Sequence, residues 1–197
     1  MQQKLGVNPF KYGVEAGTDF HSGVSSTEPS NYVGSHGNQD SDPRAVVLAT
    51  ESVSGEPPTA IGSGGLTGVW AEENTREAIF AACKRKETFG TSGVRIKVHM
   101  FAGWKYPKDL IRNADWVKTA YADGVAMGGD LSAPAGSGGP TFLLHAVKDP
   151  QSGNLDRTQA IKVTTKNGKP TLISYQSNAS LFPTSPASSS PDSSLSP

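Results

Sequence analysis

Two periodicities in the order of hydrophobic and polar residues predict the elements of this chain. From residue 74 to residue 87 apolar side chains recur at helical spacing, which predicts a helix. Asn74 followed by Glu77 resembles a capping box, and Trp70 is placed to pack against the first turn. Basic residues occupy positions 84–86 in the last turn, where the helix dipole favours cations. The apolar stripe consists of Ala78, Ile79, Ala82 and Cys83.

Beyond this helix the period changes to that of strands. Residues 94–101 alternate, with Val98 and Met100 among the apolar positions and His99 between them, and this predicts a half-buried strand. Asn167-Gly168 lies between two further alternating runs and favours a type I′ hairpin turn. The chain from residue 93 to 176 is therefore expected to form a small antiparallel β module. Its other predicted elements are strands at 142–147, 159–165 and 171–175 and a short helix within 107–120.

Near the start of the chain, residues 10–16 alternate weakly and end at Gly17, which predicts a short buried strand followed by a loop. That loop presents Asp19 and His21 close together. A carboxylate and an imidazole at a strand end suit zinc, manganese or iron, and a turn or N-cap aspartate beside a surface histidine is an equally weighted alternative. Hydrolytic metal centres need at least three protein ligands and an open position for water, so this pair is only part of such a site.

The following stretch, residues 22–68, has the composition of a loop and contains two more candidates. Glycines flank the sequence Ser35-His36, so this histidine can approach a site closely. We expect His36 to contact substrate, to donate a proton or to complete the metal site, and an exposed loop histidine is an equally weighted alternative. Glu28 is a candidate substrate-binding residue or a partner that orients His36, against the alternative of a solvated carboxylate.

Composition narrows the function classes. The 18 basic and 18 acidic residues balance, so no basic field attracts nucleic acid or anionic lipid, and no apolar run reaches transmembrane length. The hydrophobic content of 35% is low, and the Ser/Pro-rich residues 177–197 predict a disordered tail. Cys83 is expected to be an inert packed thiol, and His99 and His145 to be structural histidines. The sequence does not indicate in which cellular compartment the protein works.

Several motifs together resemble a known family. They include Gly17-Thr-Asp-Phe-His21, Gly34-Ser-His-Gly37, the stretch at 68–80 that contains Trp-Ala-Glu-Glu-Asn-Thr-Arg-Glu, and the stretch at 87–96. On these residues the chain resembles the C-terminal part of the domain-of-unknown-function 3604 family, which is similar to PHP-type (polymerase and histidinol phosphatase) metallohydrolases. The resemblance covers residues from about 6 to 162. Phe20 departs from the small hydroxyl residue usual in the family.

The resemblance implies an α+β chain in three parts. Residues 1–92 would be the C-terminal strand, active-site loop and helix of a PHP-like β/α barrel, followed by the β module at 93–176 and the tail at 177–197. Asp19 and His21 would be metal ligands on the last barrel strand. The remaining ligands, including a His-x-His pair, would lie on upstream strands, and none of the 4 histidines here belongs to such a pair. The chain is therefore expected to be a fragment that is inactive alone.

Two functions follow as hypotheses. The first is a metal-dependent hydrolase of small-molecule esters or phosphoesters, with a divalent metal (zinc, manganese or iron) as cofactor in the complete enzyme. In it, Asp19 and His21 bind metal, His36 assists catalysis and Glu28 contacts substrate. The alternative is a non-catalytic β-rich binding or structural module. Neither hypothesis includes nucleic acid or a membrane as partner.

Overall fold

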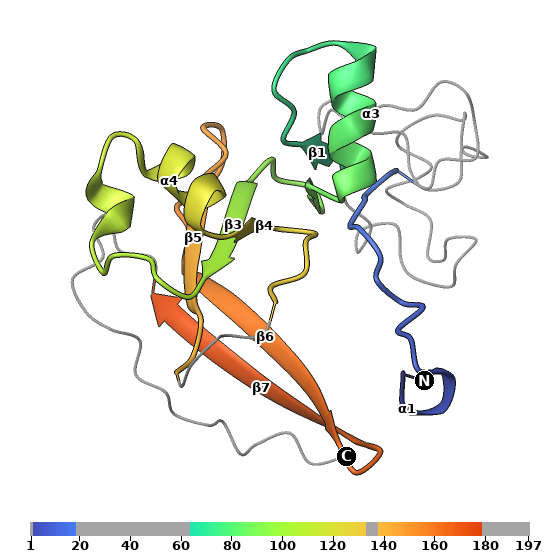
Figure 1. Ribbon diagram of the computed structural model, residues 1–197. Helices are drawn as coiled ribbons and strands as arrows, with labels where there is room; N and C mark the ends of the chain where they lie inside the picture. Colours follow the sequence, from blue (N-terminus) through green and yellow to red (C-terminus); the bar gives the residue numbers. More distant parts are fainter. Residues whose placement is uncertain (1, 19–63, 133–137, 179–197) are drawn as a thin grey trace, which may run out of the picture. The chain divides into compact units, whose positions relative to one another are not determined.

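The structure is a computed structural model that describes residues 2–18, 64–132 and 138–178 (Figure 1). The chain divides into two units: Tyr12–Asp149 forms one, and Met1–Lys11 with Pro150–Pro197 forms the other. The described part contains helices and antiparallel sheets, which confirms the predicted α+β class. The described strands form three small sheets and no closed barrel. The predicted disordered tail lies outside the described residues, apart from its first two positions.

A two-stranded sheet and one helix make up the first part of the unit Tyr12–Asp149. Strand β1 (Thr67–Val69) pairs antiparallel with β2 (Thr88–Gly90), and helix α3 (Arg76–Arg85) connects them. Gly68 lies opposite Phe89, and a Cβ atom on Gly68 would overlap the Phe89 ring. A glycine at this position therefore lets the aromatic side chain lie across the strand pair.

Helix α3 begins and ends with well-defined caps. The cap at its start is Thr75, whose hydroxyl accepts from the Ala78 N–H at 3.3 Å, so the predicted Asn74–Glu77 capping box is wrong. Lys86 ends the helix in a left-handed conformation with φ of 62°. Only Ala82 of the helix is buried, and Cys83 is exposed. The predicted packed thiol is therefore wrong, because the helix turns Cys83 away from the sheet.

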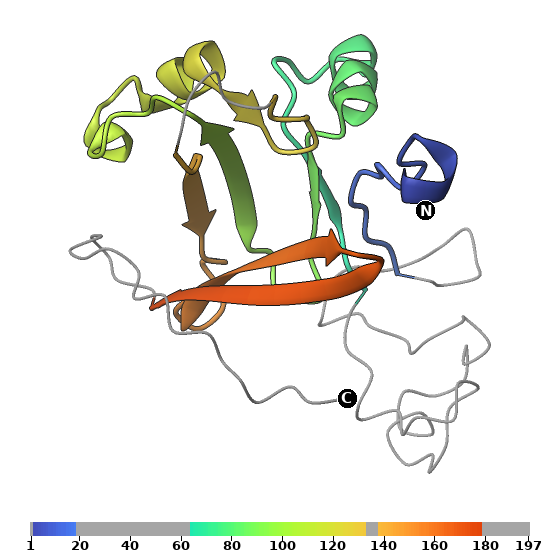
Figure 2. The same cartoon turned by 60° about the horizontal axis from the view of Figure 1, so that its bottom comes forward.

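The second sheet of this unit has three strands. Strand β3 (Lys97–Gly103) lies in its centre, between β4 (Val125–Ala126) and β5 (Thr141–Val147). The chain between β3 and β4 contains a 3-10 helix, η3 (Leu110–Arg112), and the helix α4 (Trp116–Asp123). The single helix expected within 107–120 is thus two short ones. Figures 1 and 2 show α4 lying against this sheet.

The buried face of β3 is opposite to the one its apolar alternation favours. His99, Phe101 and Gly103 are buried, whereas Val98 and Met100 are only half-buried. Two aromatic rings and α4 cover the His99 and Phe101 side, and this packing decides the face. The hydrophobic core consists of Phe101, Tyr106, Leu110, Ala120 and Leu143, with Trp116, Val117 and Ala126 packed around it.

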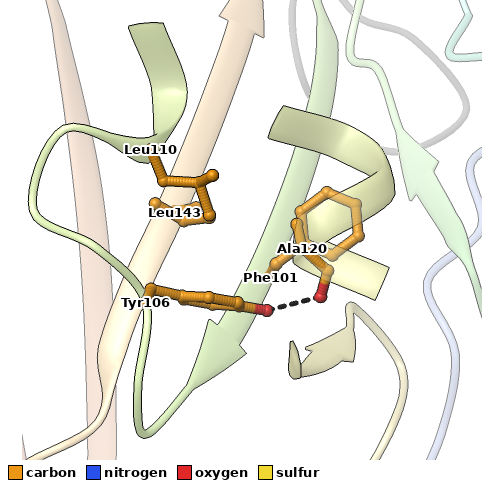
Figure 3. Close-up of a cluster of buried hydrophobic side chains, with 5 residues drawn as sticks. All are labelled: Phe101, Tyr106, Leu110, Ala120 and Leu143. Atoms are coloured by element: carbon orange, nitrogen blue, oxygen red, sulfur yellow. Dashed lines mark hydrogen bonds between the residues drawn. The ribbon is translucent and has the colours of Figure 1, made fainter. Parts of the chain in front are cut away.

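Tyr106 joins this core to the end of α4. Its hydroxyl donates to the Ala120 carbonyl oxygen at 2.6 Å (Figure 3). Burial and, to a smaller extent, the negative charge of Asp123 raise the pKa of Tyr106. A Cβ atom on Gly103 would lie 2.7 Å from the Tyr106 ring, and one on Gly124 would overlap its hydroxyl. The two glycines therefore leave the space that this ring occupies.

The stretch before the predicted metal pair is extended but forms no strand. Tyr12 and Val14 are exposed, so the predicted short buried strand at residues 10–16 is wrong. Threonine side chains take the place of a strand ladder here. The Thr67 hydroxyl accepts from Ala16 N–H and donates to its carbonyl, both at 2.9 Å, and the Thr88 hydroxyl donates to the Val14 carbonyl at 2.5 Å.

The other unit contains helix α1 (Gln2–Leu5) and a long hairpin of β6 (Arg157–Lys166) and β7 (Lys169–Asn178). The turn residues Asn167 and Gly168 have φ of 53° and 78°, as a type I′ turn requires, so this prediction is confirmed. At the start of the hairpin, the Arg157 guanidinium lies 2.8 Å from the carboxylate of Asp156. Figure 2 shows the hairpin as a twisted two-stranded ribbon.

Candidate functional site

The residues predicted from the sequence to bind metal and substrate lie outside the described residues. They are Asp19, His21, Glu28 and His36. The structure does describe the residues on either side of the stretch 19–63, which contains these four candidates. Gly65 N–H donates to the Gly17 carbonyl at 3.1 Å, and a Cβ atom on Gly64 would lie 2.5 Å from the Thr18 Cα atom. Thr18 and Gly64 are therefore neighbours beside β1.

A buried polar cluster lies on the covered face of β3. It consists of Glu87, which follows α3, His99 of β3 and Tyr121 of α4. The Tyr121 hydroxyl donates to Glu87 Oε1. His99 Nε2 lies 3.4 Å from both Glu87 Oε1 and the Tyr121 oxygen. Glu87 and His99 are only 2% and 5% exposed, whereas Tyr121 is 46% exposed and brings the cluster to the surface.

The His99 ring is enclosed by aromatic side chains. The Trp70 ring stacks on it with a centroid distance of 4.3 Å and an interplanar angle of 10°, and Phe101 lies at 4.3 Å as well. Trp70 is held in place because its indole N–H donates to the Val98 carbonyl at 2.9 Å. Burial lowers the pKa of His99; the hydrogen bond and charge of Glu87 oppose this effect, and His145 adds to it. His99 is therefore neutral at pH 7.

Glu87 is fixed by both its backbone and its side chain. Its N–H donates to the Ala82 carbonyl at 3.1 Å, and its carbonyl accepts from the Trp70 N–H at 3.0 Å. Arg85 Nε and Nη2 each lie 3.3 Å from Glu87 Oε2. Burial, followed by the hydrogen bond to Glu87, raises the pKa of Tyr121 far above its ordinary value. The Tyr121 hydroxyl therefore keeps its proton throughout the physiological range and is a hydrogen-bond donor to Glu87.

This arrangement is a hydrogen-bonded network centred on the Glu87 carboxylate. A carboxylate accepts hydrogen bonds only, and both Glu87 oxygens already receive donors. Within residues 2–18, 64–132 and 138–178, no group of three or more His, Cys, Asp or Glu side chains is placed to hold a metal ion. The predicted metal pair at Asp19 and His21 lies outside the described residues and stays a prediction.

The cluster was only partly visible in the sequence. His99 was expected to be a structural histidine with satisfied hydrogen bonds, whereas Glu87 and Tyr121 were not singled out. The available signal was the alternation of β3, in which His99 shares a face with Phe101 and Gly103. A polar residue on a buried face needs polar partners, and Glu87 and Tyr121 supply them.

The fold and the cluster define an α+β protein whose described sheets are small and antiparallel. The chain belongs to the DUF3604 family, which is described as "Protein of unknown function (DUF3604)". The model of this family matches residues 1–176 of the chain. No curated protein and no solved structure matches the chain. Among the described residues, no helix has the length and apolar character needed to cross a membrane.

Proposed function

We propose that this chain is part of a metal-dependent hydrolase of the PHP type that cleaves ester or phosphoester bonds of small molecules. Two things support the proposal: membership of the DUF3604 family, and the resemblance of Gly17-Thr-Asp-Phe-His21 to the last metal-binding motif of such enzymes. Asp19 and His21 are the proposed ligands of a divalent cation, zinc, manganese or iron.

The observation that supports this role most directly is how firmly the chain before Asp19 is held. The N–H and the carbonyl of Ala16 both form hydrogen bonds with the Thr67 hydroxyl. The Gly17 carbonyl accepts a hydrogen bond from Gly65 N–H. Because metal ligands must be held to within a fraction of an ångström, an anchored backbone up to Gly17 is what a ligand pair at Asp19 and His21 would require of the chain before it.

The proposal requires at least one further protein ligand, since two ligands rarely hold a catalytic metal. His36 is the candidate within this sequence, in addition to its proposed role as acid or substrate contact. Glu28 is the proposed substrate-binding residue of the same segment. A bound divalent cation would supply an activated water as nucleophile.

The first test is metal binding. Zn²⁺ and Mn²⁺ are titrated by calorimetry into the complete protein of which this chain is proposed to be a part, and Asp19→Ala and His21→Ala are each expected to weaken binding by more than about tenfold. His145→Gln is the matched control, because His145 lies on β5 beside Trp116. Equal affinities in all four proteins would refute the assignment of these ligands.

The second test is activity with the metal present. Hydrolysis of p-nitrophenyl phosphate, bis-p-nitrophenyl phosphate and p-nitrophenyl acetate is measured for the complete protein of which this chain is proposed to be a part, and for its His36→Ala variant. Loss of turnover with unchanged metal affinity in His36→Ala is expected if His36 acts on the substrate. Unchanged turnover in that variant would exclude His36 from catalysis.

An alternative is a non-catalytic binding or structural module. The observation that favours it is the hairpin, on which Ile161, Val163 and Leu172 are exposed and, by their register, share one face. Sedimentation velocity of the chain and of Val163→Lys tests this alternative. Association that depends on concentration and disappears in Val163→Lys would support it, and a monomer in both cases at all concentrations would count against self-association through this face.

A further inference from the structure

The Glu87–His99–Tyr121 cluster connects three elements that are distant in sequence. Glu87 follows α3, His99 belongs to β3 and Tyr121 lies on α4, so the hydrogen bonds of one carboxylate oxygen join all three. Tyr121 is the outermost member, and the two inner members are shielded from water. Any movement of α4 away from β3 would therefore admit water first between Tyr121 and Glu87.

The surroundings of His99 favour a ring without charge. Trp70 and Phe101 lie 4.3 Å away and exclude water from the ring. Of the charged groups around it, Glu87 favours a proton on the ring, whereas His145 on β5 disfavours one. Arg85 binds the other oxygen of Glu87 and offsets part of its negative charge, and Glu72 acts electrostatically on Tyr121.

We propose that Glu87, His99 and Tyr121 form an acid-sensitive clasp, which holds α4 against β3 while the His99 ring is neutral and releases it when the ring takes up a proton. In the tautomer that carries its proton on Nε2, the neutral ring donates to Glu87 and fits between its aromatic neighbours without hydration. A protonated ring needs water, and the opened state provides it at the side where Tyr121 reaches the surface.

The direction of the pH dependence follows from linkage. The pKa of His99 is lowered in the closed state, so the opened state binds the proton more tightly. The closed state is therefore fully favoured above the ordinary histidine pKa of 6.5 and loses its advantage as the pH falls toward the lowered value. Between these two pH values, the ratio of opened to closed molecules increases about tenfold for each unit by which the pH falls.

The test is amide hydrogen exchange of α4 in the full chain between pH 7.5 and 5.0, expressed as the ratio of intrinsic to observed exchange rates. We expect protection of residues 116–123 to fall about tenfold per pH unit below pH 6.5, down to the pKa of the closed state. His99→Phe fits the aromatic site and has no proton to bind, so its protection is expected to be independent of pH. His145→Gln removes only the smallest of the electrostatic effects on the ring, so it should keep the dependence, with its midpoint moved toward 6.5.

The hairpin of β6 and β7 serves as an internal reference, because it belongs to the other unit. Protection of α4 that does not change with pH, or that changes equally in His99→Phe, would overturn the proposal. An equal loss of protection in the hairpin would also overturn it, since the whole chain would then be unfolding.

A second measurement decides the matter if His99→Phe does not fold. The His99 Cε1–H resonance of the unmodified chain is followed by NMR against pH. A midpoint below 6.5, accompanied by broadening of α4 amides at the same pH, is the expected result. A midpoint at or above 6.5 overturns the clasp.

Discussion

Replacing Tyr106 by phenylalanine removes one hydroxyl from the core and leaves its ring in place. That hydroxyl donates to the Ala120 carbonyl oxygen at 2.6 Å. Ala120 is one of the last four residues of α4, whose carbonyls lack partners within the helix. The variant Tyr106→Phe therefore leaves a buried acceptor without its short hydrogen bond.

The expected loss in the free energy of unfolding follows from the burial of the two groups. Tyr106 is 7% exposed and Ala120 is fully buried, so water does not readily replace the lost donor. A buried polar group that loses its partner costs about 1–2 kcal/mol, within the range known for such losses. With a urea dependence of about 2 kcal/mol per molar, the midpoint of unfolding should fall by roughly 0.5–1 M.

The assay is urea unfolding followed by tryptophan fluorescence, since Trp116 packs against the same core. Tyr175→Phe is the matched control, because Tyr175 is 41% exposed on β7 and its change should stay within about 0.5 kcal/mol. The reasoning is refuted if Tyr106→Phe unfolds at the same urea concentration as the unmodified chain, or if Tyr175→Phe loses as much stability.

Three further changes test other parts of the same unit. Gly124→Ala should destabilise the fold by about 1–3 kcal/mol in the same urea experiment, because the new Cβ would lie 2.5 Å from the Ala102 carbonyl oxygen. Gly139→Ala is the control and should leave the stability unchanged, because nothing lies within 4 Å of its Cβ position. Thr75→Ala removes the cap of α3 and should cost about 1 kcal/mol, measured as a loss of amide protection in that helix; unchanged protection would contradict the role of the cap. The free energy of unfolding, measured by urea unfolding at several pH values, should fall as the pH drops below 6.5, because the unfolded chain binds a proton at His99 that the fold resists, and the slope should be smaller in His99→Phe.

The candidate site was predictable only where neighbouring residues carry the signal. Asp19 and His21 stand out because they are close in sequence after a glycine, and their role stays a prediction. Glu87 and Tyr121 are separated by 34 positions, and neither has a local pattern that points to the other. Their meeting depends on how α4 packs on β3, which no local periodicity describes.

Local sequence patterns account for the elements whose cause lies in neighbouring residues. The hairpin turn at Asn167-Gly168 follows from the positive φ angles that these two residues tolerate, and strand β5 (Thr141–Val147) follows from its run of strand-forming residues. The presence of α3 follows from helical spacing, although its cap is one residue later than expected.

The tertiary structure decided which face of β3 is buried and whether residues 10–16 pair as a strand. Val98 and Met100 are the more hydrophobic choice for a core, yet aromatic rings and α4 cover the side of His99. Such outcomes depend on contacts between distant segments, whose packing free energy exceeds the small preference that any one stretch expresses alone.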